Sequence, residues 1–206
     1  MTQTTPNSKE NPFDEKYAAH IIEQMKSPGV QFSKGLMDSE VRRIEELHEA
    51  QMPPDLQLFW QLALPIHDAR PGHNDAVPRW RESPEETARK SREWVRGAFE
   101  FDIRNNNYWF DEFGPKPSEV NSAVAQAVEV VDSWPRMFRV YSHRFMPSKP
   151  RETGNPVVSL YQAIDSVIYG ADLAWYLYNE FRVDAPDWDV PHVRTNPHWS
   201  RALGLE

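Results

Sequence analysis

The chain of 206 residues contains no cysteine. This absence excludes disulfides, thiolate metal sites and cysteine nucleophiles, and it fits a reducing compartment. Long hydrophobic runs are also missing, because no apolar stretch approaches the roughly 20 residues that a membrane-spanning helix needs. The polar N-terminus, MTQTTPNSKENPFDEK, has no apolar segment of the kind found in secretory signals. We therefore expect a cytoplasmic protein without a membrane partner.

Glycine is scarce, with 8 residues that never cluster, so there is no Gly-rich loop that could cradle a phosphate group. The sequence also lacks the G-x-S-x-G elbow that presents a nucleophilic serine. Without a nucleophile, metal or phosphate motif, we expect no enzymatic activity, no catalytic residue and no cofactor.

Positive charge is in deficit, because 23 lysines and arginines face 31 acidic residues and leave a formal net charge of −8. An acidic surface repels the phosphate backbone of nucleic acids. The same surface suits a basic protein partner. The composition therefore argues against nucleic-acid binding and favours a basic protein as the partner.

What the chain does contain, in its first two thirds, is a series of segments whose apolar residues recur at helical spacing. Asp38 or Ser39 can cap one of these helices, and Ser83 with Glu86 forms the capping box of another. Helices are expected over residues 13–26, 52–64, 83–101 and 118–133, and another is expected after MDSE, where Val41, Ile44 and Leu47 recur at helical spacing. Residues 65–82 are expected to form a loop.

The last third changes character. Short segments rich in β-branched and aromatic residues, MFRVYS, PVVSLY and SVIYG, predict three strands. A closing helix follows Gly170 and reaches Phe181. Helices, then a small sheet, then a helix predict a helix-rich single domain of the α+β class. Residues 1–12 are expected to form a flexible tail, and Trp188 and Trp199 to pack the Pro/Trp-rich extension, 183–206, on the domain.

Several segments, in order from about Val30 to Phe181, resemble the SUKH superfamily of the Smi/Knr type. The first is GLMDSEVRRIEELHEAQMPPDLQLFWQLAL, which carries that family's hPPDhxxFh element, followed by FDIRNNNYWFDEFGPKP. The blocks VYSHRFMPSKP, GNPVVSLYQ and IYGADLAWYLYNEF follow as strand, strand and closing helix. The chain departs from the family in its long loop around residues 67–79, its IDSVIYG strand and its extra tail.

The resemblance implies a SUKH-like domain over residues 13–182, with a small, mostly antiparallel sheet backed by helices. Members include bacterial immunity proteins that bind and neutralise cognate toxins, and fungal cell-wall-assembly regulators that act through protein contacts. The family is not known as enzymatic. Loops are where partner specificity would vary, so the departures leave the identity of the partner open.

One stretch, RNNNYWFDEFGPKP, combines acids with four aromatic residues that cannot all be buried in so short a segment. Exposed aromatics beside acids are typical of interface hot spots. Tyr108 and Trp109 beside Asp111 and Glu112 are therefore candidate residues for binding a basic partner. The alternative is that most of these rings belong to the core. His143 and Arg144, at the end of a predicted strand, are further candidates, and Arg144 alternatively pairs with a nearby acid.

Three other patterns suggest a metal site, a catalytic pair and a phosphate-binding surface. His67, Asp68, His73 and Asp75 lie in one loop and offer metal ligands, although their spacing matches no standard site. Adjacent Ser142 and His143 should point to opposite faces of a strand, which argues against a catalytic pair. We predict no metal site.

The third pattern is a basic stripe formed by Arg89, Arg92 and Arg96 on one helix face, which could contact phosphates. Ion pairs of the i,i+4 type, Glu85–Arg89 and Glu86–Lys90, favour a solvated face instead.

The sequence thus favours a non-catalytic protein-binding module, of the kind that neutralises a bacterial toxin. One alternative is a regulatory or scaffold protein of the same fold. The other is a metal-dependent enzyme built around the His67–Asp75 loop. The oligomeric state stays open.

Overall fold

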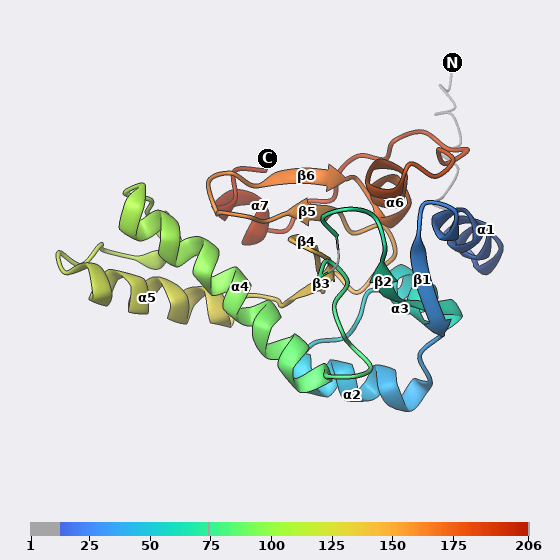
Figure 1. Cartoon of the computed structure of the whole chain (residues 1–206). Coiled ribbons are helices and arrows are strands. Elements are labelled where there is room, and N and C mark those ends of the chain that lie inside the picture. The colour runs from blue at the N-terminus through green and yellow to red at the C-terminus, as the bar shows by residue number, and fades with distance from the viewer. Residues whose placement is uncertain (1–12, 74, 206) are drawn as a thin grey trace, which may run out of the picture.

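The computed structural model describes residues 13–73 and 75–205 and has an α+β fold (Figure 1). The predicted flexible tail, residues 1–12, lies outside this part. The α-helices of the described part are α1 (Glu15–Lys26), α2 (Asp38–His48), α3 (Pro54–Leu62), α4 (Pro84–Asn105), α5 (Val120–Ser133), α6 (Leu173–Phe181) and α7 (Trp199–Ala202). A short 3-10 turn, η1 (Asp111–Phe113), lies between α4 and α5. All the predicted helices are present, and α7 was not predicted.

The larger sheet is antiparallel throughout, with strands in the order of the chain. Its strands are β3 (Met137–Tyr141), β4 (Arg144–Pro147), β5 (Val157–Ser159) and β6 (Val167–Gly170). We predicted three strands and did not predict β4. Tight turns between strands usually carry Gly or Asn in the left-handed conformation, and the β3–β4 turn has neither. Ser142 adopts this conformation instead, with φ of 42°, so the turn could not be recognised in the sequence.

Both faces of this sheet are buried, and neighbouring residues of its strands belong to different cores. Phe138, Met146 and Val157 pack into a first core with α1, α2, α3 and α6. Met137, Phe145 and Val158 pack into a second core with α4, α5 and α7. Side chains alternate across a strand, so a sheet covered on both faces needs apolar residues at consecutive positions.

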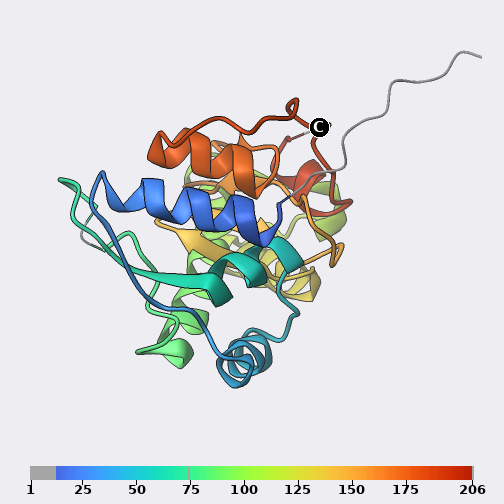
Figure 2. The ribbon, with the colours of Figure 1, turned by 90° about the vertical axis from the view of Figure 1, so that its right-hand side faces the viewer.

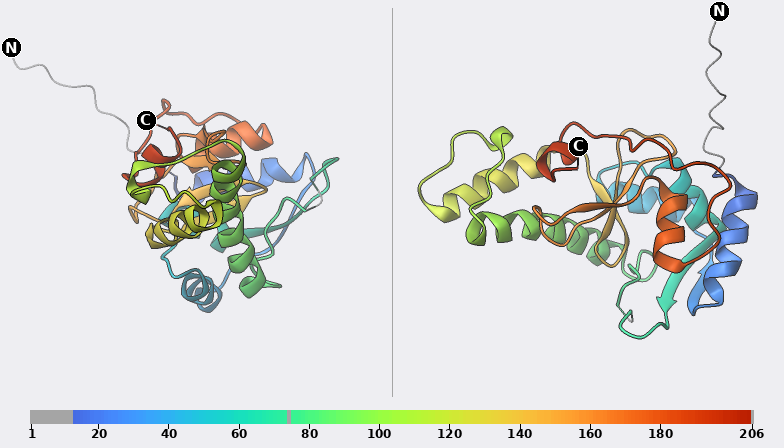
Figure 3. Two further views of the ribbon diagram at one scale, coloured as in Figure 1. Left: turned by 90° about the vertical axis from the view of Figure 1, so that its left-hand side faces the viewer. Right: turned by 90° about the horizontal axis from the view of Figure 1, so that it is seen from above.

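The two cores lie at opposite ends of the molecule. Figures 2 and 3 show α1 and α6 side by side at one end, and the antiparallel pair α4 and α5, the helical hairpin, at the other. Trp188 and Trp199, which we expected to hold the extension in place, are both buried, Trp188 in the first core and Trp199 in the second. The extension therefore contributes to both cores.

A second, two-stranded sheet pairs β1 (Val30–Lys34) with β2 (Ala63–Asp68) in antiparallel register. The prediction that residues 65–82 form a loop is therefore wrong at its start. Pro65 and the polar pair His67–Asp68 are untypical of a strand, so the sequence of β2 does not predict one. Pairing with β1 stabilises β2 instead.

Two predicted helix starts also need correction. Ser83 precedes α4 but makes no side-chain capping hydrogen bond, and Glu86 pairs with Lys90 at 2.7 Å instead of closing a capping box. At α2 the N-cap residue is Met37, whose N–H donates to the Glu40 carboxylate at 2.8 Å. In both helices the acidic residue stays in the first turn, where the helix dipole favours it.

Two buried polar side chains tie the first core to the sheet. The Asp55 carboxylate, in the first turn of α3, accepts hydrogen bonds from the N–H groups of Gly154 and Leu56, each at 3.0 Å. The His48 ring contacts the Met137 carbonyl through Nε2 at 2.9 Å. Burial raises the pKa of Asp55 to about 6 and lowers the pKa of His48 to about 4.

These two groups should act on stability in opposite directions between about pH 4 and pH 6. Folded Asp55 keeps a proton there that the unfolded chain releases, so its contribution falls as the pH rises. Folded His48 lacks a proton there that the unfolded chain holds, so its contribution grows with pH.

Replacing Asp55 by asparagine removes the contribution of Asp55 to the pH dependence of stability and leaves that of His48. The free energy of unfolding of Asp55→Asn, minus that of the wild type, should rise by roughly 2 kcal/mol from about pH 4 to pH 6. Urea unfolding at several pH values measures it, with the exposed Asp189→Asn as control. A difference that stays constant with pH would contradict the burial of Asp55.

Within the described ranges, no helix has the length and apolar content needed to cross a bilayer.

Candidate functional site

The candidate residues between α4 and α5 attach the C-terminal segment to the helical hairpin. The Tyr108 hydroxyl donates to the Ala202 carbonyl at 2.5 Å. Glu112 pairs with Arg201 at 2.9 Å and with His198 at 3.1 Å. Burial raises the pKa of Tyr108, as expected for a phenol that lies against the second core. Tyr108 and Glu112 thus bind residues 198–202 of the same chain.

The rest of this stretch forms a compact turn. Asn107 takes a left-handed conformation, with φ of 54°, as the run of asparagines predicts. The half-buried Trp109 donates its indole N–H to the Gly114 carbonyl at 2.8 Å, and Asp111 is exposed. Phe113 is buried in the second core, so one of the four aromatic rings belongs fully to the core.

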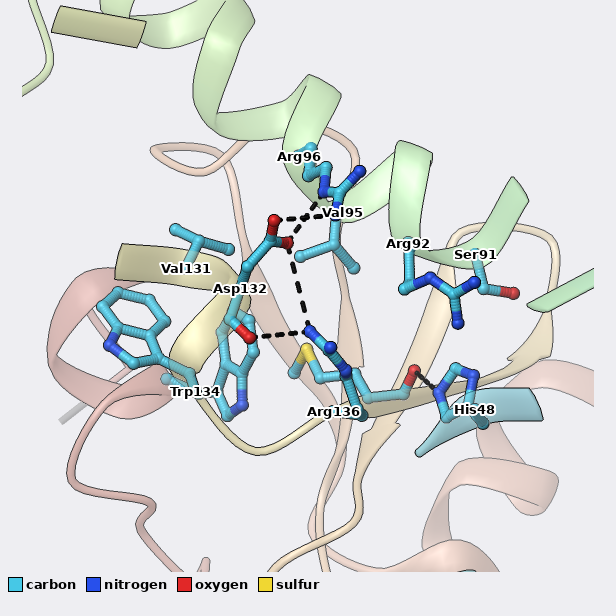
Figure 4. A pocket seen from close by; sticks show the side chains of 11 residues that line it. His48, Ser91, Arg92, Val95, Arg96, Val131, Asp132, Trp134 and Arg136 are labelled. Carbon is cyan, nitrogen blue, oxygen red and sulfur yellow. Dashed lines mark hydrogen bonds and ion pairs between the residues drawn. The ribbon is translucent and has the colours of Figure 1, made fainter. Parts of the chain in front are cut away.

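The basic stripe on α4 meets α2 and α5 around a small cavity of about 20 Å³ (Figure 4). Arg96 makes two hydrogen bonds to the Asp132 carboxylate, each 2.7 Å long. Arg92 donates to the Leu47 carbonyl, and Arg136 to the Asp132 carbonyl, both at 2.8 Å. These carbonyls lie in the last turns of α2 and α5, where the helix dipole favours a cation. Arg92 and Arg96 therefore join α4 to α2 and α5.

One predicted ion pair of the stripe is wrong. Glu85 pairs with Arg43 of α2 at 2.7 Å, and Arg89 pairs with Glu93 at 2.7 Å. The prediction followed helix spacing alone, and the neighbouring helix α2 offers Glu85 a different arginine.

His143 and Arg144, by contrast, line an open cleft of about 650 Å³ between the β3–β4 turn, α4 and α6. We call it the Arg139 cleft. Its lining side chains include Trp94, Arg139, Tyr141 and Glu180 as well as these two, and its rim includes His73 and Asp75. No contact joins this cleft to the residues at 108–112 among the interactions of the described residues. The candidate residues therefore fall into two separate groups.

Arg144 sits deep in the cleft wall with only 11% of its side chain exposed. Its Nε pairs with the Glu180 carboxylate at 3.1 Å, and its Nη1 donates to the Ser159 hydroxyl at 2.7 Å. The guanidinium also lies 3.8 Å from the centre of the Tyr169 ring. The prediction that Arg144 pairs with a nearby acid is confirmed.

A hydrogen-bonded network forms the wall beside it. The buried Asp68 carboxylate binds Arg70 at 2.6 Å and accepts a hydrogen bond from the Tyr141 hydroxyl at 2.5 Å. The same hydroxyl lies 2.6 Å from Nδ1 of His73. Since the hydroxyl has one proton and gives it to Asp68, Nδ1 of His73 must donate.

The network also fixes the protonation of its members. Burial alone would raise the pKa of Asp68, but hydrogen bonds from Arg70 and Tyr141 outweigh it and hold the pKa below its usual range. Burial, together with the hydrogen bond to Asp68, raises the pKa of Tyr141. Asp68 is therefore an anion and Tyr141 a neutral donor at neutral pH.

The expectation for Ser142 and His143 is wrong in its geometry. They occupy the β3–β4 turn instead of a strand, and the Ser142 hydroxyl lies 3.1 Å from Nδ1 of His143. Nε2 of His143 contacts the Arg144 guanidinium, which can only donate, so Nε2 accepts and Nδ1 carries the proton. Burial and then the charge of Arg144 lower the pKa of His143. With Nδ1 protonated and Nε2 occupied by Arg144, His143 has no free lone pair to activate Ser142, unlike the carboxylate-oriented histidine of hydrolytic triads.

The four candidate metal ligands of the 67–75 loop do not form one group, although Asp68 and His73 both contact the Tyr141 hydroxyl. Asp68 is bound by Arg70 and His73 by Tyr141, while His67 belongs to β2. In the described part of the chain, no group of three or more His, Cys, Asp or Glu side chains is arranged to hold a metal ion.

Trp94, Arg139 and Tyr141 were not predicted as residues of a binding site. Arg139 did leave a signal, because it is the one charged residue within the apolar strand β3. Tyr141 left none, since an aromatic residue at a strand end normally belongs to the core.

Comparisons of the chain with protein-family models, with curated proteins and with solved structures find no match. The resemblance to the SUKH superfamily therefore stays a prediction from the sequence.

The Tyr141 hydroxyl can be tested by deletion. Tyr141→Phe leaves Asp68 without one of its donors, and a lost hydrogen bond to a buried charge should lower the free energy of unfolding by about 1–3 kcal/mol. Tyr161→Phe is the control, because this tyrosine is 62% exposed. Urea unfolding of both variants measures the difference. Equal stability of the two would show that the hydroxyl adds nothing to the network.

Proposed function

We propose that the chain is a non-catalytic protein-binding module that binds and neutralises a cognate toxin in the cytoplasm. The observation that carries this proposal is the Arg139 cleft. Its side chains include two arginines, a tyrosine and a tryptophan, the residue types that dominate interface hot spots. Its histidines are held by an arginine and a tyrosine, an arrangement that supports binding better than nucleophilic catalysis.

The rim of the cleft adds aromatic contact area. Tyr161 is 62% exposed, and its ring lies 5.8 Å from the His143 ring and 6.5 Å from the Trp94 ring. Ile164 and Val167, farther along the same connection, are also exposed. An exposed tyrosine beside a cleft is typical of the centre of a protein interface.

The overall charge supports a basic toxin as the partner. A net charge of −8 attracts a positively charged protein over the distance at which the two first meet. The ordered resemblance to a family that includes immunity proteins points to the same class of partner.

Co-expression with the protein encoded by a neighbouring reading frame tests the function. We expect the chain to rescue growth and to form a one-to-one complex of nanomolar or lower dissociation constant, as tight inhibition requires. Micromolar binding to several proteins would favour a regulatory or scaffold role instead. Absence of both rescue and a co-purifying partner would contradict the proposal.

The position of the interface needs its own variant. Tyr161→Ala removes an exposed ring at the cleft and should weaken the complex at least tenfold, as loss of a hot-spot tyrosine does. Val190→Ala, at a position 60% exposed in the extension, is the matched control and should leave the affinity unchanged. Equal affinities of the two variants would place the interface elsewhere.

A further inference from the structure

Arg139 stands out among the arginines of the cleft region because it lacks an acidic partner. Arg70 and Arg144 each pair with a carboxylate, at 2.6 Å and 3.1 Å. Arg139 is half-buried, and no carboxylate of the described residues lies within ion-pair distance of it. Burial lowers its pKa, with no charged group offsetting the effect. A desolvated cation without an anion is costly, so a ligand that supplies one would be favoured.

The guanidinium is nevertheless held in one orientation. Its Nε donates to the Ser142 carbonyl at 2.5 Å, and its central carbon lies 5.2 Å from the centre of the Trp94 ring. These contacts leave the two Nη groups, the paired donors of the fork, without an acceptor among the described residues. A fixed fork of two N–H donors matches the two oxygens of a carboxylate.

Ser142 offers a further donor beside the fork. Because Nδ1 of His143 carries the proton between the two side chains, the Ser142 hydroxyl accepts there and keeps its own hydrogen for another acceptor. The backbone of Ser142 is strained, with φ of 42°, and its N–H is tied to the Ala76 carbonyl at 2.5 Å. Strain of this kind persists where surrounding contacts hold it, often at binding sites.

The sheet is also distorted at this point. The register between β3 and β4 shifts between Arg139 and Tyr141. Bulges of this kind re-aim side chains beside functional sites. Of the two acids at the cleft, Glu180 is neutralised by Arg144, while Asp75 lies exposed at the rim. The floor of the cleft therefore keeps one uncompensated positive charge.

We propose that the Arg139 cleft binds an acidic side chain of the partner protein. The partner's aspartate or glutamate carboxylate pairs with the two Nη groups of Arg139 and accepts from the Ser142 hydroxyl. An apolar residue next to it in the partner packs on Trp94 and Tyr161. This inference rests on the proposed function: the overall charge attracts a basic protein, and the cleft anchors one acid of its surface.

Small peptides test the site without the partner. We would titrate the full chain with acetyl-Phe-Glu-amide and acetyl-Phe-Gln-amide and follow backbone amide signals by NMR. The glutamyl peptide should shift the signals of Arg139, Ser142 and His143 and bind at least tenfold more tightly than the glutaminyl peptide. Equal binding of the two, or tenfold tighter binding of inorganic phosphate, would overturn the assignment.

Variants identify the residue responsible. Arg139→Gln should reduce binding of the glutamyl peptide at least tenfold, whereas the exposed Arg151→Gln should not change it. If Arg139→Gln loses its dispersed amide spectrum, Ser142→Ala replaces it and should weaken binding about tenfold or more, the loss of one hydrogen bond to a charged group. Unchanged binding by the folded variant would overturn the proposal.

The same variants separate this inference from the proposed function. If the toxin binds the wild type and Arg139→Gln equally well, the function stands and the carboxylate site is wrong. If the glutamyl peptide binds at the cleft but no toxin is found, the site stands and the proposed function is wrong.

Discussion

The strands β3 to β6 pack against side chains on both faces, so each strand must supply apolar residues at consecutive positions. Phe138, Phe145 and Met146 show the result, since each is fully buried although neighbours point to opposite faces. Burial stabilises by roughly 25 cal/mol per Å² of apolar surface, so large buried side chains such as these contribute much of the stability of the fold. The two cores therefore share one sheet, and a change in a strand acts on both.

A sheet buried on both faces leaves few places for polar side chains. In this chain they gather at the edge of the sheet, where the β3–β4 turn meets the loop after β2 and the end of α6. Asp68, Tyr141 and Glu180 are all brought there by different segments, and each is satisfied by an arginine or a hydroxyl. Buried polar groups are stable only when paired, so the cleft is a place where the fold holds charged groups in fixed positions.

The α+β fold and the helices α1 to α6 could be predicted from the sequence. The apolar stripes of these helices are long, and several of their boundaries carry prolines and acids. The sequence did not predict the β1–β2 sheet, which depends on pairing between segments far apart in the chain, or β4, whose turn after β3 carries no Gly or Asn. The candidate site was predicted in part. His143 and Arg144 lie in the cleft, but Arg139 and Trp94 come from a strand and a helix that only the tertiary fold brings together. Which arginine lacks a partner cannot be seen in a sequence, since it depends on where every nearby carboxylate lies.

The second core has a consequence for the order of folding. The Trp134 and Trp199 rings meet at 5.0 Å although 65 positions separate them, and Trp199 also donates to the Pro135 carbonyl at 2.7 Å. Contacts between such distant residues carry a loop-closure cost and form late. During synthesis, the helical hairpin must therefore wait with part of its apolar surface uncovered until residues 199–203 have left the ribosome.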